Sequence, residues 1–255
     1  MTFSVAAEAY DRFMGRYSTP LAPLLADLAD VRVGQRALDV GCGPGALTAE
    51  LVGRVGPGLV AAVDPSPPFV VAARTRHPGV EVYLAGAEQL PFADASFDLA
   101  LAELVVHFMS DPSAGLAEMR RVTRPGGTVA ACVWDFEEGG SPLSLFWQAA
   151  QDLDPGAPGE DALPGTRRGQ FGELLREAGL VDVEECTLTV DVPHPTFEDW
   201  WEPFTLGVGP AGDYVSGLDG GQMTRLVQRC RELLPEAPFT MTGRAWAARG
   251  RAPAA

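Results

Sequence analysis

Short apolar runs alternate with segments of helical composition through the first half of this chain. Five such runs occur, at residues 36–40, 59–63, 80–85, 97–102 and 128–134. The runs are largely continuous, whereas a strand with one face in water alternates apolar and polar residues. Continuous apolar strands separated by helices are typical of parallel sheets that are covered on both faces. The spacing therefore predicts an α/β fold, with a doubly wound, mostly parallel sheet and helices on both of its faces.

The chain divides into three parts on this pattern. Residues 1–34 are predicted to form an N-terminal helical cap, residues 35–135 a ligand-binding core, and residues 136–255 the completion of the sheet. Two further strands, predicted at 181–192 and 240–248, bring the sheet to seven strands. Because ligands of such sheets bind at the carboxyl ends of the strands, we expect the functional cleft there.

A long segment, about 196–238, separates the last two predicted strands. It opens with Thr196 and Asp199, which have the spacing of a helix capping box. A glycine-rich stretch over 207–221 predicts a loop, and an amphipathic pattern over 223–234 predicts a helix. We expect this segment to form a helical lid over the cleft.

The net charge is −15, from 19 basic and 34 acidic side chains. This charge restricts the classes of molecule that the chain can bind. Basic residues never cluster beyond pairs such as Arg120–Arg121 and Arg167–Arg168. An acidic chain is repelled by DNA, RNA and anionic lipid, and nucleic-acid affinity depends strongly on basic side chains at the phosphates. We therefore expect a small-molecule partner, with no nucleic acid and no membrane.

The cysteines predict neither a disulfide framework nor a metal site. They are widely spaced and form no C-x-x-C pair: Cys42, Cys132, Cys186 and Cys230. Residues Met1–Ser4 do not begin a signal peptide, and no apolar stretch approaches the roughly 20 residues of a membrane span. These features predict a cytoplasmic protein. The sequence leaves both a monomer and a homodimer open.

The segment Leu38–Gly45, with the sequence LDVGCGPG, lies between a predicted strand and a predicted helix. Glycines in such a turn let the backbone approach a ligand closely, and the helix that follows presents free amide donors. Asp64 closes the second apolar run, so in a doubly wound sheet it faces the same crevice. Its carboxylate is suited to accept both hydroxyls of a ribose.

Two ligand classes fit this loop. Gly41, Gly43 and Ala46 satisfy the dinucleotide pattern G-x-G-x-x-A, which keeps an NAD-dependent oxidoreductase as an alternative. However, Asp39 precedes the loop, and its negative charge would lie close to a bound pyrophosphate. A carboxylate there suits a cationic or zwitterionic ligand better.

Several motifs in order along residues 38–134 add to the glycine loop. They are Glu88–Phe92, the residues Asp94, Ser96, Phe97, Asp98 and Leu99, and the turn Arg124–Gly127. With the loop they resemble the class I S-adenosylmethionine (SAM)-dependent methyltransferases, and within them the small-molecule group akin to the ubiquinone/menaquinone-biosynthesis enzymes. The resemblance implies a Rossmann-like fold, SAM as cofactor, no metal, and a small-molecule methyl acceptor.

The resemblance also implies the residues of the cofactor site: Arg16, Tyr17, Asp39, Gly41, Cys42, Gly43, Asp64, Pro65, Ser66, Ala87, Glu88 and Glu103. Asp39 would organise the loop, and Asp64 would hold the ribose. Pro65 and Ser66 would lie beside the adenine, with Ala87 and Glu88 on its other side. Related sequences often carry an Asp that reaches the adenine amino group, but here that position is Gly86.

Glu103 would face the methionine part of SAM, and Arg16 would pair with its carboxylate. The candidate catalytic residue is His107, either as a general base or as a packing or cofactor contact. The candidate acceptor residues are Tyr10, Trp200, Trp201 and Phe204, although aromatic side chains at helical spacing are usually core. A protein that binds SAM without catalysis remains the other alternative.

Overall fold

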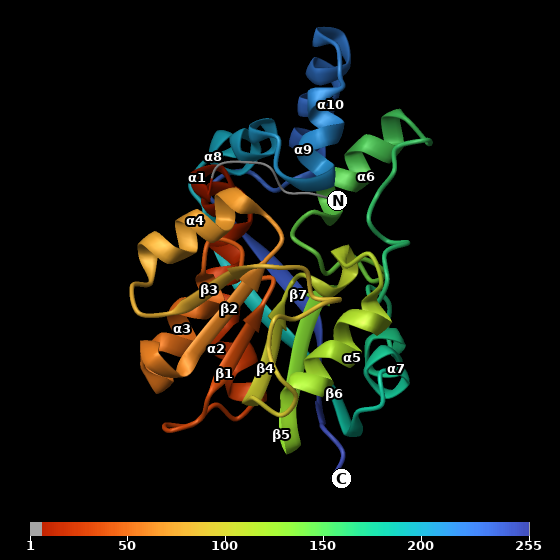
Figure 1. Ribbon diagram of the computed structural model, residues 1–255. Helices are drawn as coiled ribbons and strands as arrows, with labels where there is room; N and C mark the ends of the chain where they lie inside the picture. The colour runs from red at the N-terminus through yellow and green to blue at the C-terminus, as the bar shows by residue number, and fades with distance from the viewer. Residues whose placement is uncertain (1–6, 255) are drawn as a thin grey trace.

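Seven strands form one sheet in the computed structural model, which describes residues 7–254 (Figure 1). Their bounds are β1 Ala37–Val40, β2 Val60–Asp64, β3 Glu81–Leu84, β4 Phe97–Glu103, β5 Thr123–Trp134, β6 Val181–His194 and β7 Phe239–Arg251. The strand order is β3-β2-β1-β4-β5-β7-β6; β1 to β5 pair in parallel, and β7 runs antiparallel to both β5 and β6. The predicted mostly parallel, seven-stranded sheet is confirmed. The signal-peptide prediction concerns Met1–Ser4, which lie outside the described residues.

The order of the strands reverses between β1 and β4, which are neighbours in the sheet. Strands β2 and β3 follow β1 on one side, and β5 follows β4 on the other. At such a switch point the connections after the two strands diverge and leave a crevice at their carboxyl ends. The glycine loop after β1, Asp64 at the end of β2 and Glu103 at the end of β4 therefore meet at one edge of the sheet.

Helices cover both faces of the sheet. Successive residues of a strand point to opposite faces, so strands that are apolar throughout place apolar side chains on both faces, and the helices bury them. The elements before β1 are α1 Ala7–Tyr10, η1 Asp11–Gly15 and α2 Arg16–Leu28. Those between the strands are α3 Ala46–Val55, η2 Pro57–Leu59, α4 Pro67–Arg76, η3 Val106–Phe108, α5 Pro112–Val122 and α7 Gln170–Glu177. Leu99 of β4 lies in the core under α2 and α3, whereas its neighbour Ala100 lies in the core under α5 and α7.

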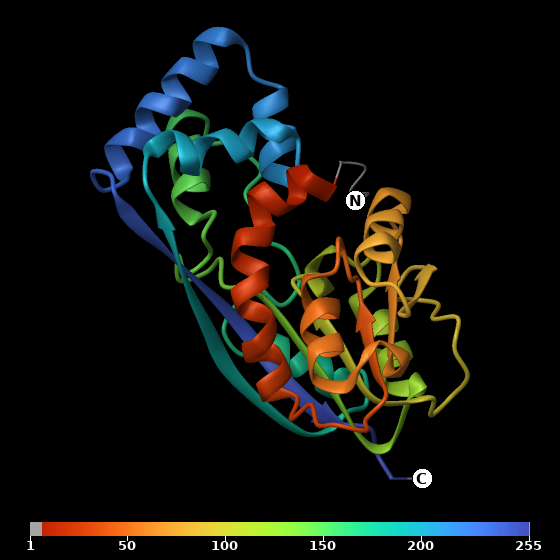
Figure 2. The same cartoon turned by 90° about the vertical axis from the view of Figure 1, so that its left-hand side faces the viewer.

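A second group of helices lies above the carboxyl edge, at the far end of the long strands β6 and β7 (Figure 2). Its members are α6 Ser144–Leu153, α8 Phe197–Trp201, η4 Glu202–Leu206, α9 Gly209–Ser216 and α10 Gly220–Leu233. The prediction of a loop over 207–221 is wrong, because α9 occupies residues Gly209–Ser216. Pro210 lies in the first turn of α9, and buried Ala211 and Val215 fix the helix by packing that glycine-rich composition does not reveal.

Two local predictions need correction. Thr196 does cap α8 by accepting the amide of Asp199 at 3.1 Å, but the Asp199 carboxylate turns to Arg16 instead of completing a capping box. The turn predicted at Arg124–Gly127 lies within β5, where the register against β4 shifts between Phe97 and Leu99.

No helix within residues 7–254 combines the length and apolar character needed to cross a bilayer.

Candidate active site

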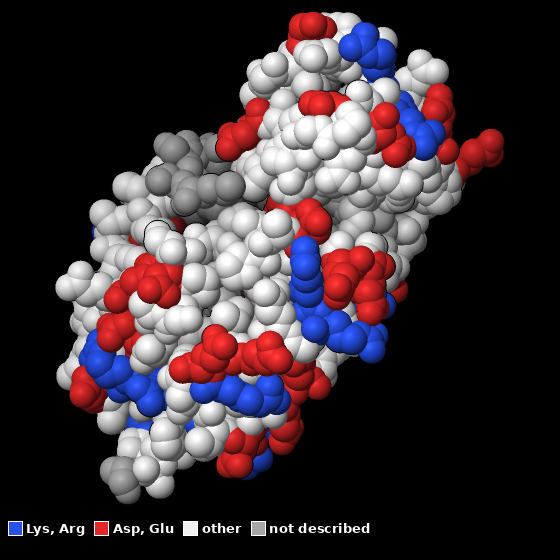
Figure 3. All heavy atoms as spheres, turned by 90° about the vertical axis from the view of Figure 1, so that its right-hand side faces the viewer, with Lys and Arg blue, Asp and Glu red and all other residues white. Residues whose placement is uncertain are grey.

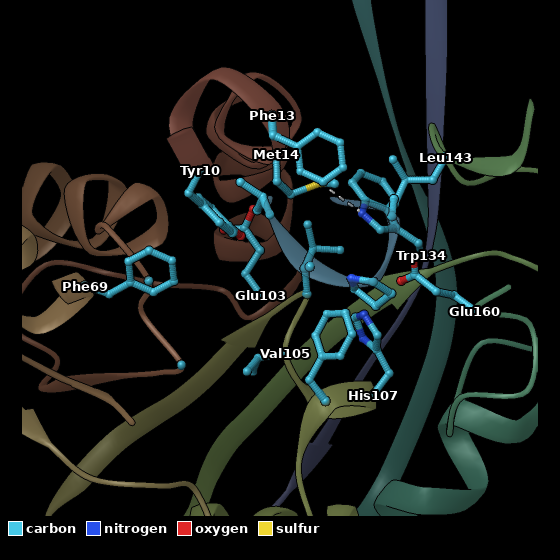
Figure 4. A pocket seen from close by; sticks show the side chains of 18 of the residues that line it. Tyr10, Phe13, Met14, Phe69, Glu103, Val105, His107, Trp134, Leu143 and Glu160 are labelled. Atoms are coloured by element: carbon cyan, nitrogen blue, oxygen red, sulfur yellow. Dashed lines mark hydrogen bonds between the residues drawn. The ribbon is translucent and has the colours of Figure 1, made fainter. Parts of the chain in front are cut away.

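A cavity opens at the carboxyl edge of β1, β2 and β4. Its lining comes from the glycine loop, the ends of β2, β4 and β5, the N-terminal helices, α4, the segments on either side of α6, and the lid (Figure 4): Tyr10, Phe13, Met14, Gly41, Gly43, Asp64, Phe69, Glu103, Leu104, Val105, His107, Phe108, Trp134, Leu143, Glu160, Val208, Gly209, Pro210 and Ala211. In Figure 4, Tyr10 and Phe69 lie at one end, and Trp134, His107 and Glu160 lie at the other. The predicted cofactor residues therefore account for only part of the lining.

The glycine loop needs glycine for conformation and for space. Gly41 and Gly43 have φ values of 74° and 53°, in the left-handed region. A Cβ at Gly41 would also lie 2.4 Å from Cγ2 of Val105. Any larger residue at Gly41 would therefore displace either the loop or the segment after β4.

Asp64 ties the end of β2 to this loop. Its Oδ2 accepts the amide of Gly43 at 2.8 Å, and its Oδ1 accepts the amide of Ser66 at 2.8 Å. A carboxylate oxygen accepts more than one hydrogen bond, so each oxygen keeps capacity for a further donor. Burial raises the pKa of Asp64 despite these two amides. The arrangement fits a ligand with two adjacent hydroxyls, as in a ribose.

Asp39 lies beneath the glycine loop, where it borders a smaller pocket with Cys42 and Glu103. Its Oδ2 accepts the hydroxyl of Thr48 at 2.6 Å, while its Oδ1 meets no donor among residues 7–254. Burial raises the pKa of Asp39 to about 7. The thiol of Cys42 is buried, and burial raises its pKa as well, so it stays protonated.

Glu103 is the least satisfied polar group of the site. Within the described part of the chain, neither of its oxygens meets a hydrogen-bond donor. Its pKa lies well above the usual value, first because of burial and then because Asp39 is close. A buried carboxylate without a partner is unfavourable, and an ammonium group is a natural complement. The unpaired oxygens of Asp39 and Glu103 thus fit the cationic amino-acid end of SAM.

His107 lies on η3 and lines the cavity, but it is poorly suited to act as a base. The residue is 3% exposed, and its Nδ1 has no hydrogen-bond partner among the described residues. Burial disfavours the charged imidazolium and lowers the pKa of His107 to about 3. The side chain is therefore neutral at physiological pH, and it can donate or accept a hydrogen bond from the cavity wall.

The four residues expected around the adenine do not line the cavity. Pro65 is exposed, and the amide of Ser66 binds Asp64. Ala87 is buried in the core under α5. Oε1 of Glu88 accepts the amides of Ser110 and Asp111 at 2.8 and 3.3 Å.

Arg16 and Tyr17 also lie outside the cavity. The guanidinium of Arg16 binds both carboxylate oxygens of Asp199, at 3.0 and 3.2 Å. The hydroxyl of Tyr17 lies 3.0 Å from Nε2 of His194. Both contacts join α2 to the strand and helix that carry the lid. The expected pairing of Arg16 with a cofactor carboxylate is thus not supported, because Asp199 already neutralises it.

The three aromatic residues of the lid pack against one another, against α6 and against η1. Phe204 stacks on Phe146 with centroids 4.5 Å apart and meets Phe13 edge-on at 5.1 Å. Trp200 and Trp201 are buried in the same cluster. None of the three lines the main cavity, whereas Tyr10 does. The core interpretation of these aromatic residues fits the structure better than the acceptor interpretation.

Several lining residues were not predicted from the sequence. Glu160 comes from a loop rich in Pro, Gly and acidic residues, and 208–211 come from the stretch predicted as a loop. No sequence pattern marks Phe69, Trp134 or Leu143 as a site residue. Loop length was the one available signal, because long loops in compact domains are often functional.

Comparison with known proteins identifies the family. Residues 38–131 match the family described as a methyltransferase domain. A malonyl-[acyl-carrier protein] O-methyltransferase of Erwinia billingiae is 36% identical over 192 residues, which cover 75% of this chain and 72% of that protein. An uncharacterized 37.1 kDa protein in transposon Tn4556 of Streptomyces fradiae is 44% identical over 108 residues. That match covers 41% of this chain and only 31% of the Streptomyces protein.

The fold has solved counterparts. One is the putative methyltransferase in a complex with the Haloferax volcanii Trm112 methyltransferase activator, at a TM-score of 0.62 and 22% identity. The match covers 97% of this chain and 94% of that one. The sheet order, the acidic cleft and the sequence relatives agree with one another. This chain belongs to the class I SAM-dependent methyltransferases.

Proposed function

We propose that this chain transfers a methyl group from SAM to a small acceptor that carries no negative charge. The observation that supports this proposal is the charge of the cavity wall. Asp64, Glu103 and Glu160 line it, and within residues 7–254 no Arg or Lys side chain does. Such a wall attracts cations and repels anions. The Erwinia relative is named for a malonyl substrate, which has a free carboxylate, and this cavity offers such a group no basic partner.

The cofactor is assigned to the end of the cavity formed by the glycine loop, Asp64 and Glu103. Asp64 would accept the ribose hydroxyls, and Glu103 would lie near the ammonium group. SAM supplies a methyl group on a positively charged sulfur, so the protein's main task is to position the acceptor and exclude water. Neutral His107 would contribute a hydrogen bond from the wall.

A nucleic-acid acceptor is not expected. On the face drawn in Figure 3, Arg side chains lie among acidic ones rather than in a broad basic area. The absence of a metal requirement, the cytoplasmic location and the choice between monomer and homodimer stay predictions from the sequence.

Binding followed by turnover tests the proposal. S-adenosylhomocysteine (SAH) should bind in calorimetry, and incubation with SAM should methylate members of a panel of small amines or alcohols rather than the matching carboxylic acids. Methylation of carboxylates alone would contradict the proposed acceptor class. SAH binding without any product across the panel would favour a protein that binds SAM without catalysis.

A further inference from the structure

The end of the cavity away from Tyr10 and Glu103 has a single acidic side chain among the described residues that line it, Glu160. The loop that carries it, between α6 and α7, is held by internal hydrogen bonds. The hydroxyl of Thr166 donates to the carbonyls of Asp161 and Leu163, and the amide of Gly165 donates to Gln170. Glu160 therefore sits on an ordered loop and not on a loose tip.

A second contact fixes the side chain itself. The indole Nε1 of Trp147, on α6, donates to Oε1 of Glu160 at 2.9 Å. Figure 4 shows the carboxyl group of Glu160 directed from its loop toward the interior of the cavity. Only 4% of Glu160 is exposed. The carboxylate is thus positioned at the cavity wall and held there by a buried donor.

Glu160 has no ionic partner. Across residues 7–254, no Arg or His side chain lies within ion-pair distance of it, and the donor that its carboxylate meets is the neutral indole of Trp147. A buried carboxylate that meets one neutral donor is incompletely compensated. Burial accordingly raises the pKa of Glu160 to about 7, although the Trp147 bond opposes this. A cation or strong donor in the cavity would supply the missing partner.

The surroundings of Glu160 restrict that partner. Glu103, the residue assigned to the ammonium group of the cofactor, lies toward the other end of the cavity beside Tyr10, so that ammonium is not the natural partner of Glu160. The other polar side chain at this end is the neutral imidazole of His107, and the rest of the wall is apolar and partly aromatic, with Phe13, Phe108 and Trp134. Aromatic walls with a few placed polar groups are typical of sites for small, largely apolar ligands.

We infer that Glu160 is the residue that recognises the methyl acceptor, and that the acceptor is an apolar amine, preferably one with an aromatic ring, which binds this carboxylate as an ammonium. For transfer the ammonium gives one N–H proton to Glu160, and the neutral nitrogen then bonds to the methyl group as the bond between that methyl and the sulfur of SAM breaks, which leaves SAH. This inference rests on the proposed function and specifies its acceptor. Trp147 acts as a positioning residue, because it holds the carboxylate without facing the ligand. An alcohol would bind more weakly, since it brings a hydrogen bond without the charge.

Three probes that share a phenyl ring and differ in their polar group test the inference: 2-phenylethylamine, 2-phenylethanol and phenylacetate. Each is titrated into the SAH-loaded protein by calorimetry or by ligand-observed NMR. The amine should bind at least about tenfold more tightly than phenylacetate, as expected for a charge-assisted contact against a repelled anion. Glu160→Gln keeps an acceptor for Trp147 and removes the charge, and it should reduce the preference to within about threefold.

The matched control is Asp161→Asn, which removes the same charge from the exposed neighbouring residue. It should leave the preference for the amine unchanged. SAH affinity is measured first for each variant, so failure of SAH to bind the wild type would overturn the proposed function itself. With SAH bound, equal affinities for amine and carboxylate, an unchanged preference in Glu160→Gln, or no binding of any probe at millimolar concentration would overturn the inference alone.

Discussion

The carboxylate of Asp64 accepts the backbone amide of Gly43 at 2.8 Å, so the end of β2 fixes the turn that follows β1. The same carboxylate also holds the amide of Ser66 at the start of α4. One side chain thus orders both segments that border the nucleoside end of the cleft. Its two oxygens are oriented before any ligand arrives, which lowers the entropic cost of binding.

Replacement of Asp64 by Ala should weaken SAH binding at least about tenfold, because two hydroxyl contacts are lost and the glycine loop loses its anchor. Calorimetry gives the affinity, and a thermal melt checks that the variant is folded. Asp94→Ala removes an exposed carboxylate outside the cavity and is the matched control. Unchanged affinity in Asp64→Ala would show that the ribose assignment is wrong.

Glu103→Gln should make the ligand-free protein more stable and its SAH binding weaker. The buried carboxylate has no donor in the described structure, and its raised pKa reflects that cost. A neutral amide removes the cost, and each 1 kcal/mol gained should raise the Tm by about 2–4 °C. Loss of the negative charge should lower the affinity for the ammonium-bearing ligand by about tenfold or more. A lower Tm with unchanged affinity would contradict this role.

His107 should remain neutral across the physiological range. Protonation would place a charge in a buried site, so burial lowers the pKa to about 3. Measured by NMR from pH 8 to pH 5, the His107 ring resonances should not titrate, whereas an exposed histidine titrates near pH 6.5. A His107 midpoint between pH 6 and 7 would restore the general-base interpretation of this residue.

The stability of the wild type relative to Glu160→Gln should fall as the pH rises from about 4.5 to 7. The pKa of Glu160 is raised to about 7 from 4.5 in the folded protein, so the folded state binds the proton more tightly than the unfolded state. The cost of the buried charge is absent below the unfolded pKa and complete above the folded one. It amounts to at most about 3 kcal/mol.

Urea unfolding of both proteins at pH 5 and pH 7.5 measures this difference. The subtraction removes the opposite contribution of His107, whose lowered pKa makes stability rise with pH in both proteins. A wild type that gains stability relative to the variant as the pH rises would show that Glu160 is paired when ionised.

Gly41, Gly43, Asp64 and Glu103 line one cavity, and the sequence could place them together because their determinants are local. Gly41 and Gly43 need their conformation in a single turn, and Asp64 and Glu103 end apolar runs whose alignment follows from a parallel sheet. Each feature is visible within a few residues. The sheet order then brings them together without further information.

The other end of the cavity depends on contacts between distant segments. Glu160 reaches the cavity only because Trp147 and a hydrogen-bonded loop hold it, and neither has a periodic pattern. Arg16 was assigned to the cofactor from its place in the N-terminal segment, but Asp199, far along the chain, engages it. Such pairings follow from tertiary packing, which one sequence does not display.

Calorimetry with SAH and, separately, with NADH tests most directly whether the cleft recognises SAM. We predict saturable SAH binding with one site per chain and no binding of NADH, since the acidic residues around the glycine loop repel a pyrophosphate. Binding of NADH, with no heat and no thermal stabilisation from millimolar SAH, would contradict the account.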